Sequence, residues 1–168
     1  MTPLNGGEFI DTVTQFDIVG LVETHCGPQE ELSLDGYHIY QNHRPKTKAA
    51  TRYFGGIAVC IRNSIRQGIK VLPTSSTEIM WLRLCKRFFN LPSDLFIAMV
   101  YISPNGTSYS SRREDIFEIL ETDLAKYTQL GICLLCGDFN ARTGCESDYC
   151  LDADSHINYP QVIYKMCP

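Results

Sequence analysis

The stretch LLCGDFNARTG, residues 134–144, is an apolar run that ends abruptly in Gly-Asp-Phe-Asn. Such a run is typical of a buried strand, and the side chains of a strand alternate between its two faces. We therefore expect Asp138 and Asn140 on one face and Phe139 on the other. Two polar side chains on the same face, at the end of a buried strand, indicate a functional site.

Length and composition limit what this site can belong to. The chain has 168 residues, of which 44% are hydrophobic, so a single domain with a sizeable core is expected. No basic-flanked apolar segment indicates a signal peptide, and no run approaches the roughly 18 apolar residues of a membrane-spanning helix. We predict a soluble intracellular protein, nuclear or cytoplasmic, with no membrane partner.

The eight cysteines are expected to be free thiols, because a disulfide framework is typical of small secreted chains. Cys133 and Cys136 form a CxxC pattern, a spacing that can bind zinc. Both cysteines lie on an expected strand, where positions three apart face opposite sides. The pair is therefore not expected to hold a metal jointly.

The formal net charge is -4, which argues against a general attraction to nucleic acid. The charge is unevenly distributed, because residues 41–70 hold seven basic residues and no Asp or Glu. Two interpretations of this basic segment stay open. It is either a solvated loop and strand edge, or a surface that contacts the phosphate backbone of a nucleic acid.

Apolar or alternating runs bounded by turn residues predict six strands. They are residues 16–22, 37–40, 56–61, 79–84, 95–102 and 132–135. The first run, FDIVGLV, and the fifth, LFIAMVYI, are almost continuously apolar. This character is expected for strands that are covered on both faces, so helices should lie outside the sheet.

Two helices are expected from the periodicity of apolar residues. Residues 115–127 carry apolar side chains at helical spacing, and Ser111 with Glu114 forms a capping box before them. A weaker helix is expected over residues 8–15. A helix, five strands, a helix and a strand, in this order, favour an α/β sandwich over a simple doubly wound sheet.

Polar side chains close three of the expected strands. Glu23 follows the first strand, and Tyr101 and Asn105 close the fifth. Asp138 and Asn140 close the sixth. Because ligands of α/β sheets bind at the carboxyl ends of strands, we expect these side chains to converge on one crevice.

These residue types suit metal-dependent hydrolysis of a phosphodiester. Glu23 offers a hard carboxylate ligand for Mg²⁺, with Mn²⁺ as a substitute ion. Asp138 would orient or deprotonate the water, and Asn140 would donate to the phosphate. The Tyr101 hydroxyl would stabilise the developing negative charge. Each residue also has an ordinary interpretation: a solvated strand end, an aromatic ring at the core edge, or a pair of turn residues.

Five motifs in order carry a resemblance to a known family: GLVETH, RYFGGIAVCIRN, EIMWLRL, VYISPNGTSY and GDFNARTG. They resemble the exonuclease–endonuclease–phosphatase superfamily, which includes apurinic endonucleases and pancreatic deoxyribonuclease. Within it, the chain is most similar to the endonuclease domain of LINE-type (non-LTR) retrotransposons. The resemblance covers roughly residues 8–152. It divides the chain into a partial domain over residues 1–152 and an unrelated tail over residues 153–168.

The resemblance implies a two-sheet α/β sandwich of the deoxyribonuclease type, metal-dependent phosphodiester cleavage and nicking of DNA. By motif, Glu23 corresponds to the metal-binding glutamate and Tyr101 to the active-site tyrosine. Asp138 and Asn140 correspond to the catalytic aspartate and asparagine of GDFN. His25 has no catalytic counterpart and is interpreted as structural.

DNA is the expected partner. The candidate contacts are Asn105 and, within the basic segment, Arg44, Lys46, Lys48 and Arg52. The four basic residues lie in a loop before an expected strand, where they would hold a phosphate backbone with an affinity that falls as salt rises.

The chain departs from the family pattern at both ends. Family members begin with a strand ending in an asparagine, and Asn5 does not correspond to it. They also carry a C-terminal aspartate and a Ser-Asp-His motif, whereas Asp154-Ser155-His156 has a different order and follows GDFN too closely. Loss of that histidine would remove an acid–base partner worth about 10²- to 10⁴-fold. The sandwich is expected to be incomplete, with uncovered sheet edges.

Three functions follow from these observations. The first is a Mg²⁺-dependent, retrotransposon-type nicking endonuclease, impaired by loss of the C-terminal histidine. The second is a catalytically inactive remnant or interaction module that keeps the fold without turnover. The third is a phosphatase of the same superfamily, which the retroelement-like motifs disfavour. Metal-dependent nicking distinguishes the first two.

Overall fold

The structure, a computed structural model, describes residues 2–3, 6–46, 50–104 and 113–140. The helical elements in these ranges are α1 (Gly7–Val13), the 3₁₀ turn η1 (Arg66–Gly68), α2 (Lys86–Phe89) and α3 (Arg113–Thr128). The strands are β1 (Thr2–Pro3), β2 (Ile18–Val22), β3 (Leu32–Ser33), β4 (Tyr37–Asn42), β5 (Ile57–Arg62), β6 (Ile69–Leu72), β7 (Ile79–Leu84), β8 (Asp94–Tyr101) and β9 (Gly131–Asp138).

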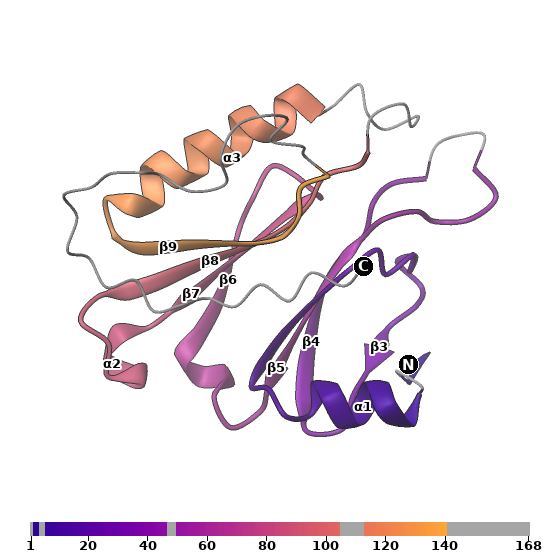
Figure 1. Cartoon of the computed structure of the whole chain (residues 1–168), viewed down its shortest axis with the longest axis horizontal. Coiled ribbons are helices and arrows are strands. Elements are labelled where there is room, and N and C mark those ends of the chain that lie inside the picture. The colour runs from indigo at the N-terminus through magenta and orange to yellow at the C-terminus, as the bar shows by residue number, and fades with distance from the viewer. Residues whose placement is uncertain (1, 4–5, 47–49, 105–112, 141–168) are drawn as a thin grey trace, which may run out of the picture.

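The strands form two main sheets that pack face to face. One has three antiparallel strands in the order β2-β5-β4, and the other has four strands in the order β6-β7-β8-β9. Only β8 and β9 in the second sheet are parallel. A short parallel pair, β1 with β3, lies beside the first sheet. Helix α3 covers the outer face of the four-stranded sheet, and α1 lies beyond the three-stranded one (Figure 1). The expected two-sheet α/β sandwich is confirmed.

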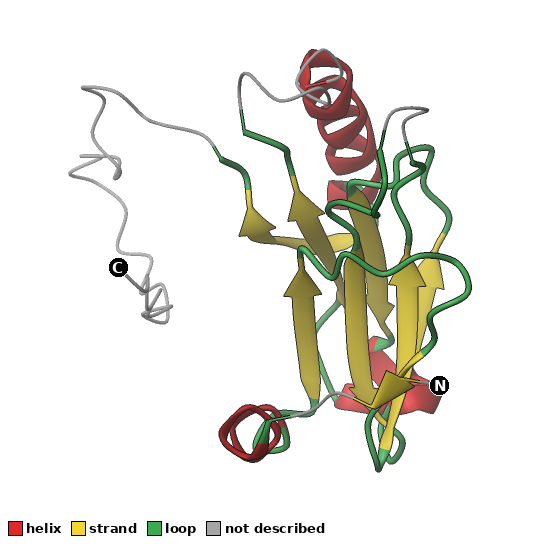
Figure 2. Ribbon diagram, turned by 90° about the vertical axis from the view of Figure 1, so that its right-hand side faces the viewer, coloured by secondary structure: helices red, strands yellow, loops and turns green. Residues whose placement is uncertain are grey.

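The core between the sheets is built from alternate residues of the strands. On β5, Ile57, Val59 and Ile61 are fully buried, and they share one cluster with Met80 and Leu82 of β7. Complete burial of an aliphatic side chain contributes about 1.5–3 kcal/mol. The buried side chains at every second position of both strands therefore hold the two layers together. Figure 2 shows most strands of the two sheets lying roughly along a common axis.

A second core lies between the four-stranded sheet and α3. Trp81 of β7 is completely buried, and its indole Nε1–H donates to Asp123 Oδ2 on α3 at 3.0 Å. The Tyr127 ring of α3 lies 4.8 Å from the Trp81 ring and 5.0 Å from the Phe96 ring, between centroids. These contacts bury apolar area and also satisfy the indole donor, so they fix α3 on the sheet.

Strand β8 has apolar side chains on both faces, as its continuous apolar run predicts. Ile97 belongs to the core between the sheets, whereas Phe96 belongs to the core under α3. On β9, Cys136 packs on the inter-sheet side and Cys133 on the α3 side. The prediction that this CxxC pair faces opposite sides is confirmed.

All six expected strands and both expected helices are present in the described ranges, with ends that differ by a few residues. The sequence did not predict β1, β3, β6, α2 or η1. These elements are two to four residues long, too short to show a periodicity, and partners such as β7 for β6 set their conformation. The expected capping box of Ser111 and Glu114 lies outside the residues whose side chains are described.

The cysteines that the structure describes are free thiols, namely Cys26, Cys60, Cys85, Cys133 and Cys136. This agrees with the expectation for these positions. Among the helices in the described ranges, none combines the length and the apolar character that crossing a bilayer requires.

Gly137 of β9 lies against the backbone of β8, and this contact generates a prediction. A Cβ at Gly137 would lie 1.9 Å from the Val100 carbonyl oxygen, and the φ angle is +130°. Gly137→Ala should lower the free energy of unfolding by about 3 kcal/mol or more, because the strand pair must separate or distort. Urea unfolding measures the loss.

Gly36→Ala is the matched control for this change. Gly36 has a φ of +82°, but nothing lies within 4 Å of an added Cβ. Only the strain of the left-handed conformation, about 1–2 kcal/mol, is expected there. Equal losses in the two variants would contradict the close approach of Gly137 to Val100.

Candidate active site

The parallel pairing of β8 with β9 brings two of the predicted site residues together. Tyr101 is in register with Asp138 at the ends of the two strands. The Ile102 backbone N–H donates to the Asp138 carbonyl at 2.9 Å, which continues the pairing past β8. Asp138 is exposed, whereas Tyr101 is 3% exposed. Strand β9 thus continues to Asp138, three residues beyond the expected end of the apolar run.

Glu23 reaches the same place from the other sheet. It directly follows β2, and its Oε1 accepts a hydrogen bond from the Tyr101 hydroxyl. This bond joins the ends of two strands that lie in different layers of the sandwich. Of the side chains expected to converge, the structure thus brings Glu23, Tyr101 and Asp138 together at one end of the molecule.

The Tyr101 hydroxyl is held in its protonated form. Burial is the largest cause that raises the pKa of this phenol above its usual value, followed by the hydrogen bond to Glu23 and the charge of that carboxylate. The Asp138 charge acts in the same direction, while the Arg44 guanidinium opposes it. Tyr101 is consequently a hydrogen-bond donor at neutral pH and not a base.

Asp138 and Asn140 form a tight turn stabilised by their own side chains. The Asn140 backbone N–H donates to Asp138 Oδ1 at 2.8 Å, and its amide Nδ2 donates to Asp138 Oδ2 at 3.0 Å. Nδ2 also donates to the Ile102 carbonyl at 2.8 Å. Phe139 packs on the other side, in the core under α3.

The expected strand alternation is not what places these two side chains together. Strand β9 ends at Asp138, and Asn140 has a φ of +45°, in the left-handed region. Asparagine tolerates this conformation because its short side chain bonds locally. The expected arrangement is therefore present, but a turn produces it.

Backbone strain gathers at the same end of the sandwich. Of the four non-glycine residues with positive φ in the described ranges, Glu23 (+55°), His25 (+53°) and Asn140 (+45°) belong to the strand ends, and Asn90 caps α2. A left-handed residue costs roughly 1–2 kcal/mol. Strain that the surrounding structure maintains is characteristic of functional sites. Sequence patterns do not reveal this feature.

The connection before β5 fixes the strained Glu23 segment. The His25 N–H donates to the Gly55 carbonyl at 2.8 Å, and the Thr24 N–H donates to the Gly56 carbonyl at 3.4 Å. A Cβ at Gly56 would lie 2.5 Å from Thr24 Oγ1, so the two segments pack tightly there. These contacts place the residues just before β5 beside the candidate site.

Two cations of the basic segment, Lys46 and Arg52, lie close to these residues before β5, and each packs on an aromatic ring. Lys46 Nζ is 4.5 Å from the Tyr53 ring centroid, and Arg52 Cζ is 4.8 Å from that of Phe54. Both cations are exposed. The Phe54 ring meets the His25 ring edge-on at 6.2 Å, which gives His25 a packing role.

The other expected DNA contacts have different positions. Lys48 and Asn105 lie outside the described residues. Arg44 is 5% exposed and forms an ion pair with Glu78, with Nε 2.6 Å from Oε1. Its position thus differs from the surface contact expected from the sequence. Glu78 was not predicted as a site residue, although it opens the EIMWLRL motif directly before an apolar strand.

The site carries ligands of the type that Mg²⁺ prefers. Glu23 and Asp138 are exposed carboxylates, and the Asn140 side chain lies beside Asp138. In the described part of the chain, no three His, Cys, Asp or Glu side chains form a cluster that would hold a cation alone. Mg²⁺ is typically held by one or two carboxylates together with water and substrate phosphate, so this donor set fits the ion.

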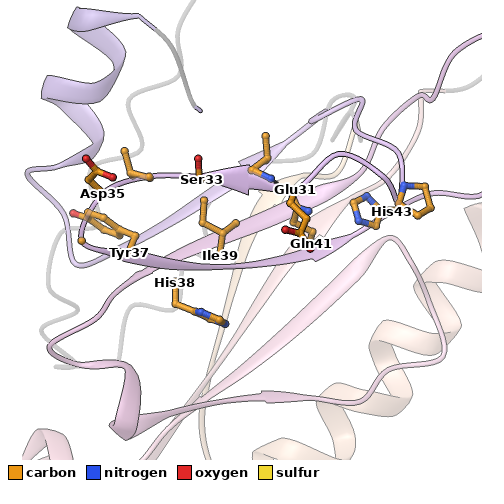
Figure 3. Close-up of a pocket in the computed structure, with 12 residues that line it drawn as sticks. Glu31, Ser33, Asp35, Tyr37, His38, Ile39, Gln41 and His43 are labelled. Carbon is orange, nitrogen blue, oxygen red and sulfur yellow. Dashed lines mark hydrogen bonds between the residues drawn. The ribbon is translucent and has the colours of Figure 1, made fainter. Parts of the chain in front are cut away.

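A hollow of about 670 Å³ lies along β3 and β4 (Figure 3). Glu31, Ser33, Tyr37, His38 and Gln41 are among the residues that line it. None of the predicted catalytic or metal-binding residues contributes to its lining. The candidate active site is therefore placed at the strand ends by Glu23, Tyr101 and Asp138 and not by this hollow.

The fold and the site now have counterparts among known proteins. The model of the endonuclease/exonuclease/phosphatase family matches residues 4–149, so the chain belongs to this family. Members are generally Mg²⁺-dependent phosphodiester hydrolases, either nucleases or phosphatases. No curated protein matches the chain significantly. The superfamily resemblance of the five sequence motifs is confirmed.

One solved structure supports the fold, and a second, weaker match is found beside it. The catalytic domain of human Nocturnin with a bound sulfate anion is 20% identical, with a TM-score of 0.51, and the match covers 78% of this chain and 54% of that one. TDP2 from C. elegans is 14% identical, with a TM-score of 0.43, and the match covers 80% of this chain and 41% of that one. The chain thus spans about half the length of these structures.

The Asp138–Asn140 turn predicts how substitutions of Asn140 affect stability. Asn140→Asp should lower the free energy of unfolding at pH 7 by about 1–2 kcal/mol, because Nδ2, which donates to oxygens of Asp138 and Ile102, becomes an acceptor. Asn140→Gly loses the same side-chain bonds without adding a charge, and glycine tolerates the φ of +45°, so this change should cost less. Urea unfolding of both variants measures the difference, and equal costs would contradict this orientation of the amide.

Proposed function

We propose that the chain is a DNA-nicking endonuclease domain of the LINE-type retrotransposon lineage, dependent on Mg²⁺ with Mn²⁺ as a substitute ion. The order of the five sequence motifs supports this branch of the family. The observation that carries the proposal is the hydrogen bond from Tyr101 to Glu23, beside Asp138. It brings a donor, a metal-binding carboxylate and a second carboxylate to one place. The proposed domain extends over residues 1–152, with residues 153–168 as a separate tail.

Each residue has a role that its position permits. Glu23 would hold Mg²⁺, which when bound offsets the negative charge of the scissile phosphate. The protonated Tyr101 hydroxyl donates a hydrogen bond at the same point. Asp138 is exposed and orients or deprotonates the attacking water. The amide of Asn140 holds Asp138 in place through the bonds of the turn.

Lys46 and Arg52 would contact the DNA backbone next to this site. Both are exposed, and Arg52 lies on the ring of Phe54, which itself touches His25 near Glu23. Charge contacts of this type carry no sequence information and weaken with salt. Lys48 and Asn105 remain proposed contacts on the strength of the sequence alone.

A catalytically inactive domain that binds without turnover is the second candidate function. One observation favours it: the Tyr101 side chain is only 3% exposed and its hydroxyl already donates to Glu23, so this donor has little freedom to reach a substrate. The same experiment separates the two candidates.

The first prediction of this proposal concerns turnover. The purified chain should nick supercoiled plasmid with Mg²⁺ and not with EDTA, and Asp138→Ala should lower the rate by about 10²- to 10⁴-fold, because the water loses its acid–base partner. Asp35→Ala, an exposed aspartate in a turn beside β4, is the control and should leave nicking unchanged. Folded chain that shows no nicking would reject the endonuclease in favour of the inactive domain.

A second prediction concerns DNA binding. Lys46→Ala and Arg52→Ala should each weaken binding of duplex DNA and reduce the slope of log affinity against log salt by about 0.9 per lost phosphate contact. Arg87→Ala on α2 is a matched control. Arg87 is an exposed cation near the start of β8, at the opposite end of that strand from Tyr101. Fluorescence anisotropy in a salt series measures all three. Unchanged slopes for Lys46 and Arg52 would contradict this contact surface.

A further inference from the structure

A buried ion pair between Arg44 and Glu78 has no role in the function proposed above. Arg44 Nε lies 2.6 Å from Glu78 Oε1, and Nη2 pairs with Oε2, so the contact is a two-pronged fork. The side chains are only 4% and 12% exposed. Compared with well-packed apolar residues of similar volume, a buried ion pair commonly gives a fold no extra stability. Its distinctive contribution is fixed geometry.

The guanidinium of Arg44 contacts the catalytic tyrosine. Its Cζ lies 5.1 Å from the Tyr101 ring centroid, on the ring face. Gly55 leaves room for it, because a Cβ there would lie 2.6 Å from Cζ, and the φ of +71° suits glycine. The planar group is therefore confined by the ring and by the backbone before β5.

The pair also joins the two sheets at the end that carries the site. Arg44 follows β4 of the three-stranded sheet, and Glu78 precedes β7 of the four-stranded sheet. The Tyr101 backbone N–H donates to the Glu78 carbonyl at 2.9 Å. Asn42 Nδ2 donates to the Ile79 carbonyl at 3.1 Å, which ties β4 to β7 at the next position. Tyr101 thus contacts both members of the pair.

We propose that Arg44 is a positioning residue, which together with Glu78 holds the Tyr101 ring so that its hydroxyl stays directed at Glu23. The inference rests on the proposed function of Tyr101 and Glu23, and it assigns Arg44 a role other than a contact with DNA. Lysine cannot replace arginine here, because an ammonium group has neither the fork nor the flat face.

The position of the Tyr101 ring can be measured without turnover. The chain is labelled with 3-fluorotyrosine at its nine tyrosines, and ¹⁹F resonances are assigned with Tyr101→Phe and Tyr37→Phe. Arg44→Lys and Glu78→Gln should each shift or broaden the Tyr101 resonance and leave the other resonances in place. Glu78→Gln keeps the shape of the side chain, so it makes the same test should Arg44→Lys fail to fold.

Arg62 offers a closely matched control variant. Its Cζ lies 5.1 Å from the Tyr37 ring centroid, and its Nε lies 2.6 Å from Asp17 Oδ1, so it has the same two kinds of contact. This pair is more exposed and involves the end of β5, on the side of Phe16 and away from Glu23. Arg62→Lys should move the Tyr37 resonance and leave that of Tyr101 unchanged.

Steady-state kinetics distinguish a positioning role of Arg44 from a direct contact of Arg44 with DNA. If Arg44 positions Tyr101, Arg44→Lys should lower kcat by up to about 100-fold, with KM nearly unchanged, for both plasmid and bis(p-nitrophenyl) phosphate. A DNA contact would instead raise KM for plasmid alone, in a salt-dependent way, and would overturn the proposal. An unchanged Tyr101 resonance in both Arg44→Lys and Glu78→Gln would also overturn it. A wild-type chain without turnover would reject only the proposed function, because the fluorine resonances still decide the position of the ring.

Discussion

Burial of the two sheets against each other is the constraint on which the rest of the structure depends. Ile57, Val59 and Ile61 of β5 are buried completely in the inter-sheet cluster, and alternate residues of β7 and β8 complete it. A shift of one residue in the register of any of these strands would exchange its buried and exposed faces. The core therefore sets how far each strand extends, and with it the level at which Tyr101 meets Glu23.

The end of the sandwich that carries the site contains features that do not stabilise a fold. Glu23 and His25 have left-handed backbones, and Arg44 with Glu78 places charges in the interior. Each feature has a cost that the core must offset. At the opposite end, Asn90 closes α2 in the same left-handed conformation, where asparagine is an ordinary cap. The distribution of strain thus distinguishes the end that carries the candidate site from the opposite end.

Periodicity explains which parts of the fold were predictable. Strands such as β7 and β8 are long enough to show an apolar pattern, so their existence and the burial of both β8 faces follow from the sequence. Strand β6 has four residues and forms because β7 offers it a partner. In the site, Asp138 and Asn140 were predicted together, but the left-handed turn that joins them depends on the bond from Asn140 to the Ile102 carbonyl.

The sequence by itself determined the class of fold and singled out the candidate site residues, because polar side chains after apolar runs mark strand ends and the ordered motifs mark the family. Only the tertiary structure decided which of these residues touch. The bond from Tyr101 to Glu23 spans 78 positions, and Arg44 reaches Glu78 across 34. From the sequence, a basic residue in a loop is expected to be exposed. The burial of Arg44 arises from contacts with residues far away in the sequence. Arg44 therefore changed from an expected surface cation to a buried residue that packs on the Tyr101 ring.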